Sequence, residues 1–264
     1  RDPWTTIDFY GQLMLTRWAD AKHHRLEKDV LKTADKVTTV SWHWAAELGE
    51  IANREVHVVT NGYDEQDYEG LVRKPDKKFS ITHIGLLSVE RKLIHFWTAV
   101  KELNEEIPTL KTDLVIRLAG KVDFAVLDEL KSMGLSAFVE NKKYLPHEEA
   151  LQMQVNASVL LLVLNDVPNA KGHIPGKLFE YLAAQRPIIC VGPSNGDAAS
   201  ILSETKAGEA FDFDDKEGMK KHLKVLYVLF QKHQLISINS GEQIYSRQKC
   251  ASQVSSILNE IRDE

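Results

Sequence analysis

The sequence predicts an α/β protein built on a Rossmann-like parallel β-sheet with helices on both of its faces. From Val37 onward, β-branched apolar runs of strand length alternate with amphipathic stretches of helical length, a pattern typical of β-α-β units. Several runs, such as SVLLLVL at 158–164, are apolar at consecutive positions, as expected for strands that helices cover on both sides. The 264 residues, 43% of them hydrophobic, are enough to form a full core.

The expected strands follow one another along most of the chain. They cover residues 37–42, 56–60, 79–85, 113–120, 137–145, 158–164, 187–192 and 209–213. Helices are expected over 93–103, where apolar residues recur at helical spacing, over 146–155, which starts with a proline at its first position, and over 175–184. The tail opens with a capping-box pattern from Ser240 to Gln243 and continues as a terminal helix.

The chain is expected to divide near residues 61–78, a segment rich in charged and turn residues. Only two expected strands precede it, too few for an independent α/β domain. We therefore expect residues 1–61 to be the end of an N-terminal domain whose beginning is missing, or an extension packed on the second domain. The main domain is expected over 62–239 and the terminal helix over 240–264.

Charge and cysteine content argue against several classes of protein. The formal net charge of −5 argues against a general surface for nucleic acid or anionic membranes. The two cysteines, Cys190 and Cys250, suggest neither a disulfide framework nor a cysteine-based metal site. The longest apolar run is far too short to span a membrane, and the N-terminus lacks a signal-peptide pattern. We expect a cytoplasmic protein with no nucleic-acid partner and no membrane segment in this chain.

Ligands of open α/β sheets bind beyond the carboxyl ends of the strands, which points to the loops 85–92, 120–123, 165–176 and 192–197. In the first of these, Gly85 ends a strand and Arg91 and Lys92 begin the next helix. Cations are unfavourable at a helix N-terminus, and a bound anion would offset this. Alternatively, both are solvated surface charges.

The third loop, NDVPNAKGHIPGK, contains glycines close to the start of a helix. Gly172 and Gly176 suit close approach of backbone N–H groups to a phosphate, and His173 lies between them. The alternative is a mobile connection without function.

The helix that follows carries Lys177 and Glu180 among small residues on one side, opposite a side of larger apolar residues. One interpretation is a groove in which Glu180 accepts hydrogen bonds from ligand hydroxyls and Lys177 meets negative charge. The other is close packing of a neighbouring helix, with the two charges paired at i, i+3.

Other motifs carry less information. His23, His24 and His43 lack a matched set of metal ligands, so no metal site is expected, and the tryptophans that flank His43 are expected to pack. His147 is expected to begin a helix. The sequence has no GxSxG, GxxxxGK[ST], HExxH or GxGxxG motif, so catalytic residues stay unassigned and a dinucleotide-binding dehydrogenase is disfavoured.

Taken together in order, the motifs resemble GT-B glycosyltransferases of family GT4 over residues 28–262. VHVVTNGYDEQDY resembles their interdomain segment, ITHIGLLSVERK and LVIRLAG resemble the first strands of the donor domain, and FVENKKYLPHEEALQMQVNASVLLLV resembles the base-binding loop, helix and next strand. IPGKLFEYLAAQRPIICVG is similar to a variant common among capsule and lipopolysaccharide glycosyltransferases.

This resemblance implies a site for a nucleoside-diphosphate sugar, usually without a metal cofactor, and transfer of the sugar to an acceptor hydroxyl with retention of configuration. Glu180 would hold the ribose hydroxyls, Arg91 and Lys92 the diphosphate, and residues from Val139 to Tyr144 the base. The loop 172–177 would lie against the diphosphate and sugar. A full-length enzyme of this type, a hexosyltransferase of polysaccharide biosynthesis, would sit at the periphery of the inner membrane.

The sequence departs from the family in three ways. Leu86 follows the loop glycine where many members have a cation, and Gly172 replaces the first of two glutamates spaced eight apart. About the first half of a typical enzyme has no counterpart, so we expect this chain to bind donor but to turn over poorly or not at all. Two alternatives stay open: a non-catalytic donor-binding subunit completed by a partner chain, and a nucleotide-sugar epimerase of GT-B fold.

Overall fold

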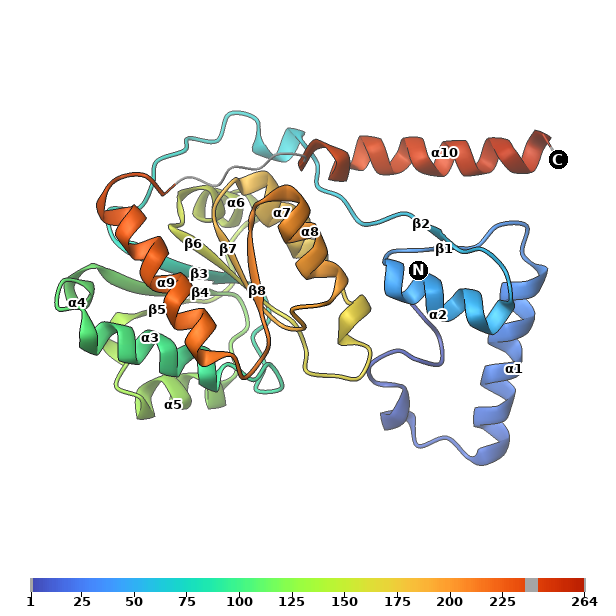
Figure 1. Cartoon of the computed structure of the whole chain (residues 1–264), viewed down its shortest axis with the longest axis horizontal. Helices are drawn as coiled ribbons and strands as arrows, with labels where there is room; N and C mark the ends of the chain where they lie inside the picture. Colours follow the sequence, from blue (N-terminus) through green and yellow to red (C-terminus); the bar gives the residue numbers. More distant parts are fainter. Residues whose placement is uncertain (1, 236–241, 264) are drawn as a thin grey trace.

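The structure is a computed structural model that describes residues 2–235 and 242–263. Its centre is a six-stranded parallel sheet with the strand order β5-β4-β3-β6-β7-β8 (Figure 1). The strands are β3 (Phe79–Ile84), β4 (Leu114–Ala119), β5 (Val139–Lys142), β6 (Val159–Val163), β7 (Ile188–Val191) and β8 (Gly208–Phe211). The expected α/β class and parallel sheet are therefore confirmed.

Helices cover both faces of the sheet, as the consecutive apolar residues predict. One face packs against α3 (Ile94–Glu106), α5 (Phe124–Ser132) and α9 (Lys216–Gln231), and the other against α6 (His147–Asn156), α7 (Gly176–Ala184) and α8 (Asp197–Thr205). In β6, Val159, Leu161 and Val163 enter the first core, whereas Leu160 and Leu162 enter the second. Successive side chains of a strand point to opposite faces, so every residue of this strand is buried.

The chain order reverses between β3 and β6, which are neighbours in the sheet but far apart in sequence. These two strands pair only at Ile81–Thr82 with Val159–Leu160 and separate toward their carboxyl ends. At the end of β3 a side chain of α7 takes the place of the neighbouring strand: the Tyr181 hydroxyl accepts a hydrogen bond from the Ile84 N–H at 3.1 Å. Such a switch point is where open α/β sheets form ligand crevices.

Residues 2–61, here called the first segment, form a smaller unit beside the sheet (Figure 1). It contains η1 (Tyr10–Leu13), α1 (Arg17–Thr33), β1 (Thr38–Thr39), α2 (Trp42–Ala52) and β2 (His57–Val58), and β1 and β2 pair in parallel apart from the main sheet. Its own small core consists of Leu31, Leu48, Ala52 and Val56.

A buried carboxylate joins the first segment to the sheet unit. Asp197, at the first position of α8, is only 4% exposed. It accepts hydrogen bonds from the His43 backbone N–H at 2.9 Å and lies 2.6 Å from His43 Nδ1. The carboxylate therefore lies at the N-termini of two helices, which favour negative charge.

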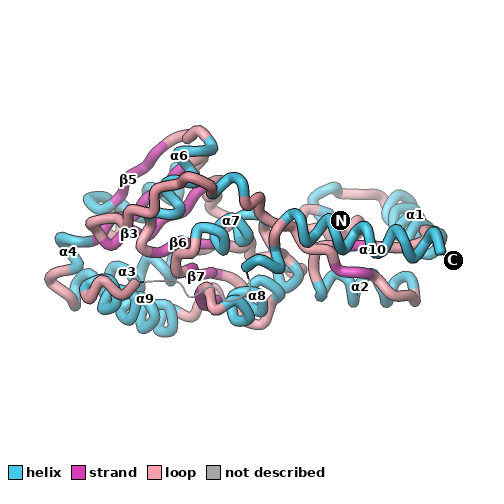
Figure 2. Tube along the Cα trace, turned by 90° about the horizontal axis from the view of Figure 1, so that it is seen from above, coloured by secondary structure: helices cyan, strands magenta, loops and turns pink. Residues whose placement is uncertain are grey.

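The terminal helix is present but begins later than the capping-box pattern predicts. A short 3₁₀ turn, η5 (Glu242–Tyr245), precedes α10 (Arg247–Asp263), and Ser240 lies outside the described residues. α10 leaves the sheet unit and runs along the first segment (Figures 1 and 2), where Glu260 pairs with Lys36 at 3.4 Å. No helix in the described ranges combines the length and the apolar character needed to cross a membrane.

The remaining short elements are η2 (Gln66–Tyr68), α4 (Leu110–Asp113), η3 (Ser136–Phe138) and η4 (Ala170–Gly172). The prolines expected inside the first turns of α6 and α7 lie one residue earlier. Pro146 and Pro175 are the N-cap residues of these helices. His147 begins α6, as expected.

Candidate functional site

Two glycines bring the loops after β3 and β4 close together at the crevice. Gly85 has φ +120° and Gly120 has φ +116°, a region that glycine alone adopts readily. The Gly85 N–H donates to the Ala119 carbonyl oxygen at 2.7 Å, and a Cβ on Gly120 would lie 2.6 Å from the Gly85 oxygen. A side chain at position 120 would push these loops apart.

Lys177 places its ammonium group against the bare α-carbon of Gly85. A Cβ on Gly85 would overlap Lys177 Nζ, so the glycine makes room for the cation at the end of β3. Burial lowers the pKa of Lys177 from 10.5 to about 8, with a further lowering by Arg91 and an opposing effect of Glu180. Lys177 is therefore a cation that its surroundings stabilise poorly.

Arg91 is the second cation of the crevice. Its Nη1 donates to the Leu86 carbonyl oxygen at 2.8 Å and its Nε to Asn165 Oδ1 at 3.2 Å. Burial lowers its pKa. Within the described ranges, both partners of Arg91 are neutral, and no carboxylate pairs with Arg91 or Lys177. We call Arg91 and Lys177 the cation pair.

Lys92 is placed differently from its neighbour. Its Nζ lies 2.6 Å from Asp166 Oδ2, and its side chain is 65% exposed. The structure therefore brings Arg91 together with Lys177 and leaves Lys92 in a solvated ion pair. The role expected for Lys92 at a diphosphate stays a prediction.

His83 lies below the cation pair and was not anticipated from the sequence. It is fully buried, with Nδ1 2.9 Å from the Leu161 carbonyl oxygen and Nε2 3.3 Å from that of Leu86. Burial, followed by the charges of Lys177 and Arg91, lowers the pKa of His83 to about 3. A neutral imidazole therefore braces the loop after β3 and adds no third positive charge.

Glu180 lies one helical turn beyond Gly176 and lines a cavity of about 650 Å³, here called the large cavity. Its Oε2 accepts a hydrogen bond from Gln154 Nε2 at 3.1 Å. The Tyr68 hydroxyl lies 2.9 Å from the Glu180 carbonyl oxygen, and burial raises the pKa of Tyr68. The i, i+3 ion pair with Lys177, one of the two interpretations of this helix, is not formed; instead Gln154 of α6 binds the Glu180 carboxylate, which lines the large cavity.

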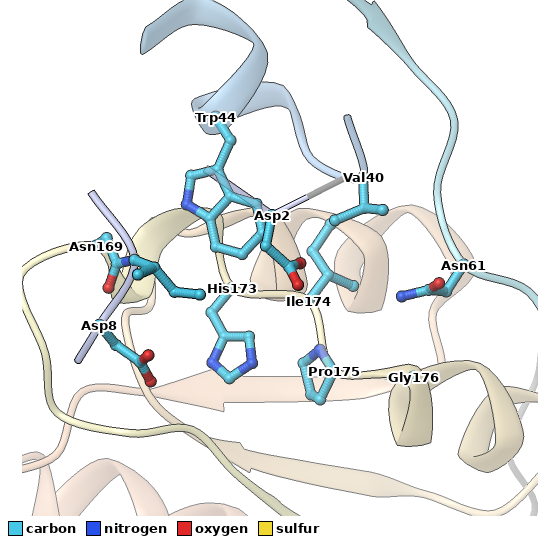
Figure 3. A pocket seen from close by; sticks show the side chains of 11 residues that line it. Asp2, Asp8, Val40, Trp44, Asn61, Asn169, His173, Ile174, Pro175 and Gly176 are labelled. Atoms are coloured by element: carbon cyan, nitrogen blue, oxygen red, sulfur yellow. The ribbon is translucent and has the colours of Figure 1, made fainter. Parts of the chain in front are cut away.

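A second cavity of about 220 Å³, here called the small cavity, lies between the first segment and the loop 165–176 (Figure 3). Asn61 and Gly176 line both cavities. His173 stacks on Trp44 with ring centroids 6.4 Å apart and an interplanar angle of 15°. Burial lowers the pKa of His173.

Trp44 also gives a physical reason for the glycine at position 172. A Cβ on Gly172 would overlap the indole ring of Trp44, which is 6% exposed. The tryptophan, expected only to pack, thus occupies the space that a side chain at position 172 would need. A glutamate at position 172 would therefore overlap the Trp44 ring in this structure.

The two residues expected to bind the base of the nucleotide lie apart from the two cavities. Val139 is the first residue of β5 and packs on the core of the sheet. Tyr144 is 88% exposed in the segment that follows β5. Neither lines the large or the small cavity, and their role stays a prediction.

Within the described part of the chain, no group of three or more His, Cys, Asp or Glu side chains could hold a metal ion.

Comparison of the sequence with protein families and with curated proteins found no match. Solved structures do match. Sucrose-phosphate synthase (tll1590) from Thermosynechococcus elongatus superposes with a TM-score of 0.70 at 14% identity, over 98% of this chain and 66% of that one. The pneumococcal O-GlcNAc transferase GtfA, solved with UDP and GlcNAc, gives 0.66 at 12% identity over 92% and 48%.

Anabaena Alr3699/HepE, solved with UDP-glucose, gives a TM-score of 0.66 at 13% identity, over 90% of this chain and 68% of that one. The chain thus spans from about half to about two thirds of the length of these proteins. At these identities the likeness concerns the fold alone. The chain has the α/β fold that GT-B glycosyltransferases share.

Proposed function

We propose that this chain is the donor-binding part of a glycosyltransferase and takes its sugar from a nucleoside-diphosphate sugar. The observation that carries the proposal is the cation pair at the switch point of the sheet. Among the described residues, no carboxylate forms an ion pair with Arg91 or Lys177, although the charge of Glu180 partly offsets that of Lys177. Two cations without an ion-pair partner beside the N-terminus of α7 favour a ligand with at least two negative charges, as a diphosphate has.

The spacing of groups along α7 supports the same ligand. Glu180 follows Gly176 by four residues, which corresponds to roughly 6 Å along a helix axis. A diphosphate at the N-terminus of α7 would leave an attached ribose within reach of the Glu180 carboxylate. An ionised carboxylate accepts hydrogen bonds on both oxygens, which suits the paired hydroxyls of a ribose.

The cation pair would also contribute to the chemical step. In the transfer, the bond from the anomeric carbon to the β-phosphate oxygen would break, a bond to the acceptor oxygen would form, and the proton of the acceptor hydroxyl would pass to an oxygen of the departing diphosphate. Negative charge grows on the departing diphosphate, and Arg91 and Lys177 are placed to stabilise it. No covalent nucleophile is required, and we assign no catalytic residue.

The finer points of the proposal depend on the sequence resemblance. We propose retention of configuration, a hexose as the transferred sugar and a role in surface polysaccharide biosynthesis. This rests on the likeness of residues 174–192 to the capsule and lipopolysaccharide enzymes. The UDP and GlcNAc bound in the solved structure of GtfA and the UDP-glucose bound in that of HepE support the ligand class. A cytoplasmic location, at the inner membrane surface for the full enzyme, belongs to the same proposal.

A second candidate is a non-catalytic donor-binding subunit completed by a partner chain. It is favoured by apolar side chains of the first segment that are open to solvent: Phe9, Leu13, Met14 at 89% exposure and Trp18 at 74%. Patches of this kind mark interaction surfaces. Sedimentation over a concentration series tests it, because association through this surface would increase with concentration. A monomer at every concentration, with sugar transfer by this chain alone, would contradict it.

Calorimetric titration of the purified chain with UDP, GDP, ADP and CMP tests the proposed function. We expect saturable binding of one nucleoside diphosphate, and a loss of at least about tenfold, or roughly 1.4 kcal/mol, in Glu180→Ala. Asp128→Asn on α5, which removes a charge far from the crevice, is the control. Absence of binding by any nucleoside diphosphate to the folded chain, or binding of CMP alone, would overturn the proposal.

A further inference from the structure

The small cavity carries negative charge that the donor-binding proposal does not use. Asp2 and Asp8 extend from the N-terminal stretch of the chain toward its interior, opposite His173 (Figure 3). Among the residues that the structure describes, no Lys or Arg lines this cavity. Since burial lowers the pKa of His173, this imidazole is neutral near pH 7, and the described lining residues carry the charge of two carboxylates.

Several hydrogen bonds hold the N-terminal stretch that carries these carboxylates. Asp8 Oδ2 accepts from Asn165 Nδ2 at 3.4 Å, and the Thr6 carbonyl oxygen accepts from Asn169 Nδ2 at 2.7 Å. The backbone N–H groups of Trp4 and Thr5 donate to Glu27 Oε1 on α1 at 2.9 and 3.1 Å. The stretch is thus fixed between α1 and the loop 165–176.

The small cavity continues the row of groups that begins at Glu180. Gly176 and Asn61 are shared with the large cavity, and His173 and Asp8 lie beyond them. A ligand whose diphosphate lies at Gly176 would therefore place its next group in the small cavity. At about 220 Å³, this cavity is smaller than the roughly 300–1,000 Å³ of sites for drug-sized ligands, so it suits one ring.

We propose that the small cavity receives the sugar of the donor and selects an uncharged sugar over a uronic acid, through the carboxylates of Asp2 and Asp8. The inference rests on the proposed function and adds a substrate class to it. Sugar hydroxyls can donate hydrogen bonds to both carboxylates, whereas the carboxylate of a uronic acid has no proton to donate and meets like charge. Such repulsion is an effective means of discrimination.

The nearby cations do not remove this repulsion. Arg91 is close enough to influence the pKa of His173, but in the complex Arg91 and Lys177 are balanced by the two negative charges of the diphosphate. The other described residues that line the small cavity are uncharged, among them Trp44, Asn61 and Asn169. Within the described part of the chain, the carboxylates of Asp2 and Asp8 therefore set the charge that the sugar meets.

The test compares matched sugar nucleotides of whichever diphosphate binds: UDP-glucose with UDP-glucuronate, GDP-mannose with GDP-mannuronate, or ADP-glucose with ADP-glucuronate. We expect the Kd of the uronate to be higher by at least about tenfold at low salt, and the ratio to shrink as salt is added. Asp8→Asn should lower the ratio by about threefold. Asp128→Asn, the charge-matched control on α5, should leave it unchanged.

The outcomes separate this inference from the proposed function. Equal Kd values for the two members of a pair would overturn the inference and leave donor binding intact. A preference that responds neither to salt nor to Asp8→Asn would also overturn it, because size rather than charge would then exclude the uronate. If no nucleoside diphosphate binds the folded chain, the proposed function and the inference both fail.

Discussion

Replacing Lys177 with Met removes a partly buried charge and keeps most of the side-chain volume. Burial and Arg91 lower the pKa of Lys177 from 10.5 to about 8. A lowering of that size corresponds to roughly 3 kcal/mol against the charged form in the folded chain. After a discount for the solvent that still reaches the side chain, we expect Lys177→Met without ligand to raise the free energy of unfolding at pH 7 by about 1–2 kcal/mol.

The gain should depend on pH, because the pKa of Lys177 in the folded chain lies below its value in the unfolded chain. Below pH 8 the amine is charged in both the folded and the unfolded chain, so the full free-energy cost of burying its charge is present. Between pH 8 and 10.5 the folded chain gives up the proton first, and the wild type gains stability relative to the variant as pH rises. The difference should be largely gone above that range.

With ligand, the effect of the substitution reverses. A hydrogen bond to a charged group contributes about 1.5–3 kcal/mol, so Lys177→Met should weaken binding of the nucleoside diphosphate by roughly 10- to 150-fold. Urea unfolding over a pH series and calorimetric titration measure the two effects, with Lys131→Met on α5 as the control. A variant that is less stable without ligand, or that binds the nucleotide as the wild type does, would refute the reasoning.

Three further outcomes are expected. The pKa of His83 lies near 3 in the folded chain, so the free energy of unfolding falls as pH falls from 6.5 toward 3. His83→Gln should make the free energy of unfolding, measured with urea, depend less on pH in that range. An unchanged dependence on pH would argue against a buried neutral imidazole. Gly172→Ala should lower the free energy of unfolding by about 1–3 kcal/mol, because its Cβ overlaps the Trp44 ring. In a chain that already carries Trp44→Ala, the same substitution should lower it by less. Strictly additive effects in thermal unfolding would show that the two sites are independent. Lys92→Met should change nucleotide affinity less than about twofold, because Lys92 is already paired with Asp166 in solvent; a loss as large as that of Lys177→Met would make it a phosphate ligand after all.

Local pattern was sufficient for the order and type of the elements. Each expected strand overlaps an observed one, although β8 begins at Gly208, one residue before the expected 209–213. The strands that are buried on both faces, such as β6, need an apolar run that few other structures require. The position of Glu180 and Lys177 on a helix after the sixth strand also follows from local sequence. The ends of the elements were harder to predict from local sequence. For example, α10 begins at Arg247 because the residue before it, Ser246, forms a β-bridge with Tyr63.

Long-range contacts within the site could not be predicted in the same way. Arg91 and Lys92 are adjacent, and only the folded loop 165–176 decides that Asn165 meets the first and Asp166 the second. The overlap of Trp44 with position 172 joins residues far apart in sequence. Asp2 and Asp8 reach the small cavity only because the N-terminal stretch folds across it. No periodicity encodes such contacts, which depend on tertiary packing.

The most direct test of the central claim, that the cation pair binds a diphosphate, is the proton uptake that accompanies binding at pH 8. Since the pKa of Lys177 is about 8 without ligand and an adjacent diphosphate would raise it, roughly half a proton should be taken up per bound sugar nucleotide. Titrations in buffers of different ionisation enthalpy measure this number. We expect about half a proton for the wild type and close to none for Lys177→Met. Binding without proton uptake in the wild type would contradict the account.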